Sequence, residues 1–176
     1  MNILITGSSG EIGSYLAMEF LKKGSTVHGL DITESKLNSF DNYNHQICDV
    51  SDVSQVENCI DMIIKKSSHI NVVINNAGII YNSPIISFSA GKFVNHDFVQ
   101  WKKVVESILN GTFYVSSIAA LNMVKKSHKG LIINISSICS VGNEGQTAYS
   151  ASKAGINSLT YSMDKELGKY GIRVVA

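Results

Sequence analysis

The stretch NILITGSSGEIG, residues 2–13, decides the fold of this chain of 176 residues. Its first part, Asn2–Thr6, is apolar on consecutive positions, as expected for a strand that is covered on both faces. A turn rich in glycine and serine follows, and apolar residues then recur at helical spacing over residues 12–23. Strand, glycine turn and helix in this order favour a nucleotide-binding βα unit.

Each small residue of the turn has a physical use. Gly7 permits a tight turn, and the small Ser9 and Gly10 let the backbone approach a phosphate group closely. Gly13 lets the helix pack against the strand, and Ile12 beside it opens the helix. Because the free N–H groups and the dipole of a helix N-terminus favour an anion, we expect these residues to hold the pyrophosphate of a dinucleotide.

The rest of the chain alternates between short β-rich runs and longer helical patterns. The predicted strands after the first are Thr26–Asp31, 45–49, 70–75, 131–136 and Ile172–Val175. The predicted helices after the first are 34–40, 54–66, 98–126 and 149–170. This alternation implies right-handed crossovers and a doubly wound parallel sheet, an α/β fold in three layers. We expect a single domain over residues 1–176.

Composition excludes several classes of protein. With 44% hydrophobic and 16% charged residues, the chain is not intrinsically disordered. A formal net charge of +1 and a single arginine, Arg173, argue against nucleic acid as a partner. No run of 18 apolar residues predicts a membrane span, and no leader pattern is present, so we expect a cytoplasmic protein. The three cysteines and five histidines lack ligand spacing, which argues against a metal site.

Asp31 ends the second strand, 18 residues after Gly13. An acid at this place can accept hydrogen bonds from both hydroxyls of the adenosine ribose, and it repels a 2′-phosphate. No arginine precedes Arg173, so none near this site could bind that phosphate. The pattern therefore favours NAD over NADP, although Asp31 could instead cap the helix that follows.

The segment NISSICSVGNEGQTAYSASKAG, residues 134–155, carries the densest chemistry. Tyr149 and Lys153 are four residues apart, so they share one face of a helix. An ammonium group beside a phenol favours the phenolate, which suits Tyr149 to general acid/base work on a hydroxyl or carbonyl oxygen. A serine at the preceding strand end could hold the same oxygen.

Taken together, these motifs resemble those of the short-chain dehydrogenase/reductase family, which has a Rossmann-type fold. The matching features run over nearly the whole chain in the family's order: TGSSGEIG, Asp31, Asp49-Val50, NNAG at residues 75–78, the serine strand, and Tyr149 with Lys153. The resemblance implies that Asp49 and Val50 hold the adenine ring. It also implies that Lys153 binds the nicotinamide ribose and that Tyr149 is the acid/base. The cofactor would further be lined by Asn76, Ala77 and Gly78.

Four features depart from the family's pattern. Glu11 stands where a glycine is common, so the turn also fits the sugar-nucleotide branch of the family. The catalytic serine is Ser137 by alignment on the strand and Ser136 by counting back from Tyr149; we prefer Ser137, because loops absorb deletions more easily than strands absorb register shifts. Ile108 occupies the place of the family's catalytic asparagine, which predicts an impaired or rerouted proton relay. The fourth departure is that the chain ends within the predicted sixth strand, which suggests that the sequence is partial.

The leading interpretation is an NAD-dependent oxidoreductase that interconverts a secondary alcohol and a ketone by hydride transfer. Ser137 would orient the substrate oxygen, Tyr149 would exchange its proton, and Lys153 would assist Tyr149. One alternative is a catalytically impaired dinucleotide-binding module, and another is a sugar-nucleotide epimerase or dehydratase. The expected partners are a small alcohol or ketone and, through the helices at 98–126 and 149–170, further copies in a homodimer or homotetramer.

Overall fold

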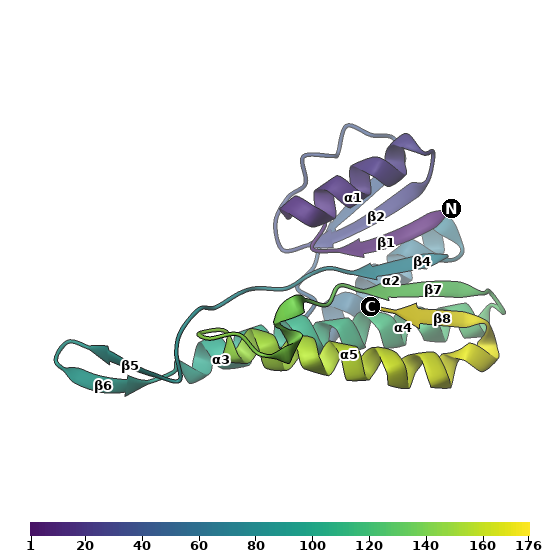
Figure 1. Ribbon diagram of the computed structural model, residues 1–176. Helices are drawn as coiled ribbons and strands as arrows, with labels where there is room; N and C mark the ends of the chain where they lie inside the picture. Colours follow the sequence, from purple (N-terminus) through teal and green to yellow (C-terminus); the bar gives the residue numbers. More distant parts are fainter.

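A computed structural model describes all residues, 1–176, and has a parallel six-stranded sheet at its centre (Figure 1). The strand order is β3-β2-β1-β4-β7-β8, so the direction of winding reverses between β1 and β4. The strands of this sheet are β1 (Asn2–Thr6), β2 (Thr26–Asp31), β3 (Tyr43–Ile47), β4 (Val72–Asn75), β7 (Gly130–Asn134) and β8 (Ile172–Val175). The predicted doubly wound α/β fold is confirmed.

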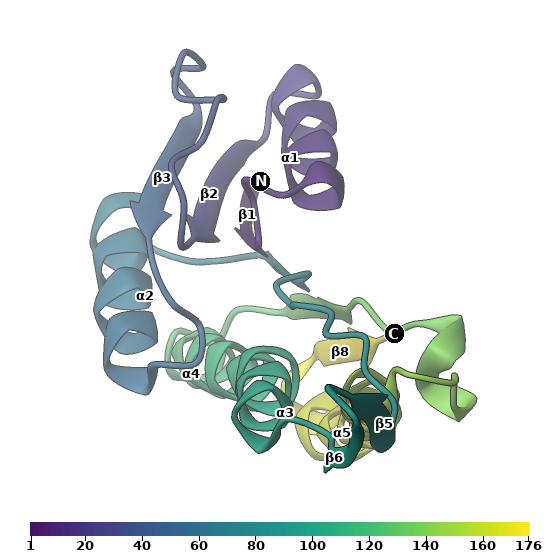
Figure 2. The ribbon, with the colours of Figure 1, turned by 90° about the vertical axis from the view of Figure 1, so that its left-hand side faces the viewer.

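Helices cover both faces of the sheet (Figures 1 and 2). The helices are α1 (Glu11–Lys22), α2 (Val53–Ser67), α3 (Phe98–Val105), α4 (Gly111–Lys125) and α5 (Thr147–Leu167). On one face α1 packs through Ala17 and Leu21 against apolar side chains of β1 and β2. On the other face α2, α4 and α5 contribute to the larger core, which includes Leu4, Val73 and Ile132 of the sheet. These apolar side chains explain why the central strands are apolar on consecutive positions.

Two predicted elements near the sheet edge differ from the structure. Residues 34–40, predicted as a helix, contain only a turn over residues 36–39, with Leu37 buried against the α1 face. Such a short segment gives few hydrogen bonds in return for the cost of starting a helix. Strand β3 begins two residues earlier than predicted, since its polar sequence YNHQI suits an edge strand that pairs on one side only.

The connection after β4 contains a hairpin that the sequence reading missed. Strands β5 (Ile86–Ser89) and β6 (Lys92–Asn95) pair with each other in antiparallel register and project from the body as an arm (Figure 1). Ala90 and Gly91 form the turn, with φ angles of 50° and 79°. Two left-handed residues in a two-residue loop match the right-handed twist of a hairpin.

The predicted helix 98–126 is interrupted by a π-helical segment, Glu106–Asn110, between α3 and α4. The combined segment Phe98–Lys125 is long and apolar enough to cross a membrane by length and composition, with a mean hydropathy of 1.3. Of that apolar window 44% is buried inside the structure, and Val115, Ala119 and Met123 belong to the core. A core helix passes the same test, so this composition carries no argument for a membrane.

Candidate active site

The glycine turn between β1 and α1 fits only residues without side chains at two positions. Gly7 has a φ angle of +64°, and a Cβ atom on it would lie 2.9 Å from the Cα of Ala77. A Cβ atom on Gly13 would lie 2.1 Å from the carbonyl oxygen of Gly7. Gly10 donates its N–H to that same oxygen at 3.2 Å. The turn therefore has the close packing of strand and helix that the sequence predicted.

Asp31 lies at the carboxyl end of β2, facing the glycine turn. Its Oδ2 accepts the backbone N–H of Ser9 at 2.9 Å, and its Oδ1 accepts the backbone N–H and the hydroxyl of Thr33, both at 2.9 Å. The carboxylate is thus fixed against the turn and is only partly buried. An ionised carboxylate can accept about four hydrogen bonds, so capacity remains for a ribose hydroxyl.

Two hydroxyl groups that the sequence reading missed support the turn from below. Ser8 is fully buried, and its Oγ accepts the phenol hydroxyl of Tyr43 at 3.2 Å. Both oxygens lie close to Gly29 of β2, where a Cβ atom would come within 2.3 Å of the Tyr43 hydroxyl and 2.5 Å of Ser8 Oγ. The glycine inside β2 was the one available signal, since glycine in a strand marks the close approach of another group.

The NNAG segment is held against β1. The backbone N–H groups of Asn76 and Ala77 both donate to Thr6 Oγ1, at 3.1 and 3.0 Å. The Asn76 side chain donates to the carbonyl oxygens of Thr6 and Gly7, at 3.2 and 3.1 Å. These bonds join the end of β4 to the glycine turn, at the point where the strand order reverses.

A cleft of about 700 Å³ lies at this reversal point. It brings together most of the predicted cofactor residues, namely Gly7, Gly10, Ile12, Asp31, Asp49, Val50, Asn76, Ala77 and Gly78. Ser9 and Gly13 lie in the turn but do not line the cleft, and neither do Tyr149 and Lys153 of α5, which were also predicted to bind the cofactor. Lys103, Glu106 and Ser107 line it as well, which the sequence did not indicate. The volume of the cleft, the carboxylate of Asp31 and the tight glycine turn fit a dinucleotide.

Asp49 does not cap the helix that follows it. Asp52, not Asp49, caps α2, because its carboxylate accepts the N–H groups of Ser54 and Gln55 at 2.9 and 3.3 Å. The Oδ1 atom of Asp49 instead accepts the N–H and the hydroxyl of Ser51, at 2.9 and 2.7 Å. Asp49 therefore stays exposed at the cleft, beside the buried Val50.

Tyr149 and Lys153 lie on one face of the first turns of α5. The Nζ atom of Lys153 is 5.6 Å from the centre of the Tyr149 ring and donates to the carbonyl oxygen of Ile135 at 2.5 Å. Lys153 is buried, and burial lowers the pKa of its ammonium group. Tyr149, with Lys153 beside it, can therefore exchange a proton with a group bound near the end of β7.

The two candidate serines have different partners. Ser136 donates its hydroxyl to Asn157 Oδ1 at 2.6 Å, which ties it to α5. Ser137 accepts the backbone N–H of Cys139 at 3.1 Å as the cap of the 3-10 helix Ile138–Val141, and its own hydroxyl hydrogen has no partner in the chain. Ser137 can thus still donate to a substrate oxygen.

Ile108 lies in the π-helical segment and is almost completely buried. It packs in a small apolar cluster with Val104, Ala148 and Ile156, against which Tyr149 also rests. A Cβ atom on Gly78 would lie 3.0 Å from Ile108 Cγ1. The side chain therefore reaches the cofactor segment but offers it no hydrogen bond.

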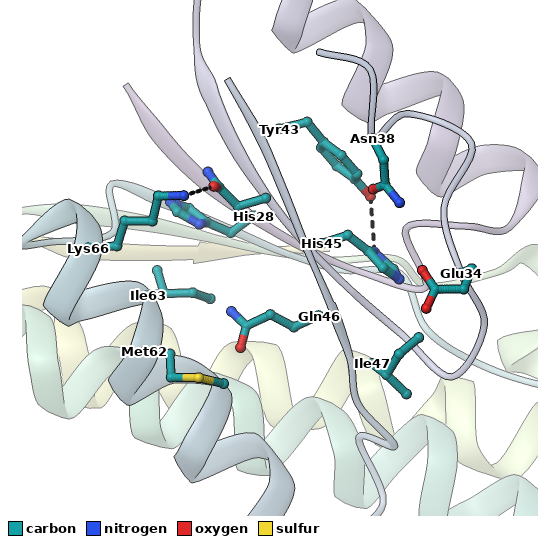
Figure 3. Close-up of a pocket in the computed structure, with 11 residues that line it drawn as sticks. His28, Glu34, Asn38, Tyr43, His45, Gln46, Ile47, Met62, Ile63 and Lys66 are labelled. Atoms are coloured by element: carbon teal, nitrogen blue, oxygen red, sulfur yellow. Dashed lines mark hydrogen bonds between the residues drawn. The ribbon is translucent and has the colours of Figure 1, made fainter. Parts of the chain in front are cut away.

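A second hollow, of about 510 Å³, lies along the outer edge of β3, away from the predicted site residues (Figure 3). Its lining includes His28, His45, Gln46 and Lys66, and the ammonium group of Lys66 donates to the side-chain oxygen of Asn44. None of the predicted catalytic or cofactor residues contributes to it.

Comparison with known proteins agrees with this geometry. The family model described as short chain dehydrogenase matches residues 1–176. Sorbitol-6-phosphate 2-dehydrogenase of Klebsiella pneumoniae is 37% identical over 98% of this chain and 66% of its own length. The 3-oxoacyl-[acyl-carrier-protein] reductase FabG of Thermotoga maritima is 31% identical, with 98% and 70% covered. The chain thus spans about two thirds of the length of these relatives.

Solved structures of similar proteins contain nicotinamide cofactors of both kinds. ElxO with NADP bound has a TM-score of 0.87 at 29% identity, covering 98% of this chain and 70% of its own. A 4-hydroxyisoleucine dehydrogenase complexed with NADH has a TM-score of 0.85 at 29% identity, covering 98% and 72%. The fold, the motifs and the match over all 176 residues lead to one conclusion: the chain belongs to the short-chain dehydrogenase family.

Proposed function

We propose that this chain is the cofactor-binding and catalytic part of an NAD-dependent oxidoreductase that interconverts a secondary alcohol and a ketone. The observation that carries the proposal is that one chain has both a cleft lined by Asp31 and the glycine turn and a Tyr149–Lys153 pair on one face of α5. The cofactor supplies the hydride chemistry when bound, and the protein supplies orientation and proton transfer.

In this proposal each residue has a role that its contacts support. Ser137 donates its free hydroxyl hydrogen to the substrate oxygen, and Tyr149 exchanges a proton with that oxygen. Lys153, whose ammonium lies near the phenol ring, favours the charged form of Tyr149. Its hydrogen bond to the carbonyl oxygen of Ile135 holds the amine next to the end of β7.

The preference for NAD rests on Asp31. A carboxylate held by Ser9 and Thr33 at the end of β2 accepts ribose hydroxyls and repels a 2′-phosphate. Calorimetry with NAD⁺ and NADP⁺ tests the preference: the chain should bind NAD⁺ at least about tenfold more tightly, a difference of about 1.4 kcal/mol. Asp31→Ser should reduce that ratio, and equal affinities for the two cofactors in the unmodified chain would contradict the assignment.

The reaction is tested with two probes suggested by the relatives, sorbitol 6-phosphate with NAD⁺ and a 3-oxoacyl thioester with NADH. Absorbance of NADH reports turnover. Tyr149→Phe keeps the ring that packs near Ile108 but removes the hydroxyl, so it should lower kcat by about 100-fold or more while NAD⁺ affinity stays unchanged. Turnover that survives in Tyr149→Phe would refute the role of this residue.

Ile108 favours a second candidate, a dinucleotide-binding module with little catalysis, because its buried side chain cannot hold a water molecule in a proton relay. This candidate predicts NAD⁺ binding with no turnover of either probe.

We also propose that the protein acts in the cytoplasm as a homodimer or homotetramer, with α4 and α5 at the interface. Phe113, Leu121 and Tyr161 are exposed on these helices and could be covered by a second copy. Light scattering of the purified chain measures the assembly, and a monomer at all concentrations would contradict it.

A further inference from the structure

The chain that leaves β4 returns to the start of α5 before it forms the hairpin arm. The backbone N–H of Ser83 donates to the carbonyl oxygen of Gly145 at 2.7 Å, and the side-chain amide of Gln146 donates to Asn82 Oδ1 at 2.9 Å. Asn143 donates to the Oε1 atom of the same glutamine at 3.0 Å. Residues 82–83 thus make two hydrogen bonds to the two residues that precede α5.

These bonds matter because α5 begins without a side-chain cap. Gln146 is the residue at the cap position, yet its side chain bonds Asn82 and Asn143 instead of the free N–H groups of the first turn. Its carbonyl oxygen accepts the N–H of Ser150 at 2.7 Å, the first helical bond of α5. An uncapped helix end frays easily, and Tyr149 lies in this turn.

The segment that holds Gln146 is itself firmly anchored. His96, which is 7% exposed, lies 3.1 Å through Nδ1 from the carbonyl oxygen of Ser83, and its backbone N–H donates to Ile85. Its ring meets Tyr81 edge to face at 5.4 Å and Trp101 of α3 at 6.4 Å. The base of the arm is therefore joined to α3 on one side and to α5 on the other.

Tyr81 extends this contact to the site. It packs against the apolar cluster of Val104, Ile108 and Ala148, on which Tyr149 rests. Tyr81 and Tyr149 therefore pack against the same cluster. A displacement of residues 81–83 would shift this cluster and with it the side chain of Tyr149.

We propose that Asn82 is a positioning residue, which holds the first turn of α5 through Gln146 and thereby fixes Tyr149 for catalysis. This inference rests on the proposed role of Tyr149. It assigns a role to the connection after β4: the base of the arm holds the residue that precedes the uncapped first turn of α5.

The test compares three single variants in the full chain. Asn82→Ala removes the acceptor for Gln146, whereas Asn82→Asp keeps an oxygen at the same place. Asn95→Ala is the matched control, an asparagine on β6 with no side-chain hydrogen bond to the rest of the chain. Hydrogen exchange of the Ser150 amide measures the order of the first turn without any need for turnover. Thermal unfolding followed by circular dichroism shows whether each variant is folded.

We expect Asn82→Ala to speed exchange at Ser150 by about three- to tenfold, the effect of losing one solvent-exposed hydrogen bond. The kcat for whichever probe is turned over should fall by a similar factor, with NAD⁺ affinity unchanged. Asn82→Asp should restore both values, and Asn95→Ala should alter neither.

Either of two results overturns the proposal: equal exchange at Ser150 in Asn82→Ala and Asn95→Ala, or an Asn82→Asp variant that behaves as the alanine variant does. Because hydrogen exchange requires no substrate, it separates this proposal from the proposed function. If Ser150 exchanges faster in Asn82→Ala but neither the unmodified chain nor any variant turns over a probe, Asn82 still positions α5. Only the proposed enzymatic reaction is then refuted.

Discussion

His28 should make the fold unstable in mild acid. Its side chain is 1% exposed, its Nε2 lies 3.0 Å from Ser67 Oγ, and its Nδ1 has no partner. Burial, followed by the nearby charge of Lys66, lowers the pKa of His28 to about 4. Lys66 donates its own hydrogen bond to Asn44, and of the two ring nitrogens of His28 only Nε2 has a partner. The second ring N–H of an imidazolium would therefore have no acceptor.

The sign and size of the effect follow from linkage. In the unfolded chain histidine has a pKa of about 6.5, so the unfolded state binds the proton first as the pH falls. Stability is complete above about pH 6.5 and declines until the folded pKa, about 4, is reached. At about 1.4 kcal/mol per pH unit the loss is up to about 3 kcal/mol, a large share of the 5–15 kcal/mol typical of a domain.

Urea unfolding followed by circular dichroism at about pH 7 and about pH 4.5 measures this loss. His28→Gln, which cannot be protonated, should lose about 2–3 kcal/mol less than the unmodified chain over that interval. His128→Gln, at an exposed histidine, is the control and should follow the unmodified chain. If all three lose the same free energy between the two pH values, His28 is not protonated on unfolding and the reasoning fails.

Two further predictions concern the site. Gly13→Ala should weaken NAD⁺ binding at least about tenfold, because the new Cβ would lie 2.1 Å from the Gly7 carbonyl oxygen and would push α1 away from the turn. Calorimetry measures the affinity for NAD⁺, and an unchanged affinity would contradict the role of Gly13 in the tight turn. Ile108→Asn should raise kcat for a probe that is turned over, since it returns a hydrogen-bonding group to the proton relay. Burial of the amide should lower the free energy of unfolding by about 1–3 kcal/mol. An unchanged kcat in the folded variant would show that Ile108 does not impair the relay.

The central strands were predictable because each can be recognised from its own stretch of sequence. Strands β1, β2 and β8 have the predicted bounds, since each is an apolar run that turn residues delimit. The turn at Gly7–Gly13 and the cleft followed from the same pattern, because the carboxyl ends of parallel strands meet at the strand-order reversal.

The missed elements depend on information that a search for helical periodicity overlooks. The alternation in ISFSAGKFVN, residues 86–95, with Ala-Gly at its centre, is a signal of a hairpin, and the strands predicted above did not include it. The support of the turn by Tyr43 and Ser8 joins residues 35 positions apart, so only the folded sheet reveals it. The same holds for Asn82 and Gln146, which are 64 positions apart.

The hairpin also shows where the fold of this family can accept insertions, deletions and substitutions. The backbone bonds of β5 and β6 are made with each other, and the contact between Ile85 and His96 at 2.8 Å brings the two ends of the arm together. A two-stranded hairpin is marginally stable on its own, so the part of the arm beyond this contact depends on its base. The arm forms a sheet of its own and does not pair with the central sheet. Its length and sequence can change by insertion or deletion without disturbing the sheet, and its exposed Phe88 and Phe93 are free to diverge. Among related sequences, changes in length and sequence should therefore be most frequent beyond Ile85. They should be rare at the base of the arm, where Asn82 and His96 make their hydrogen bonds.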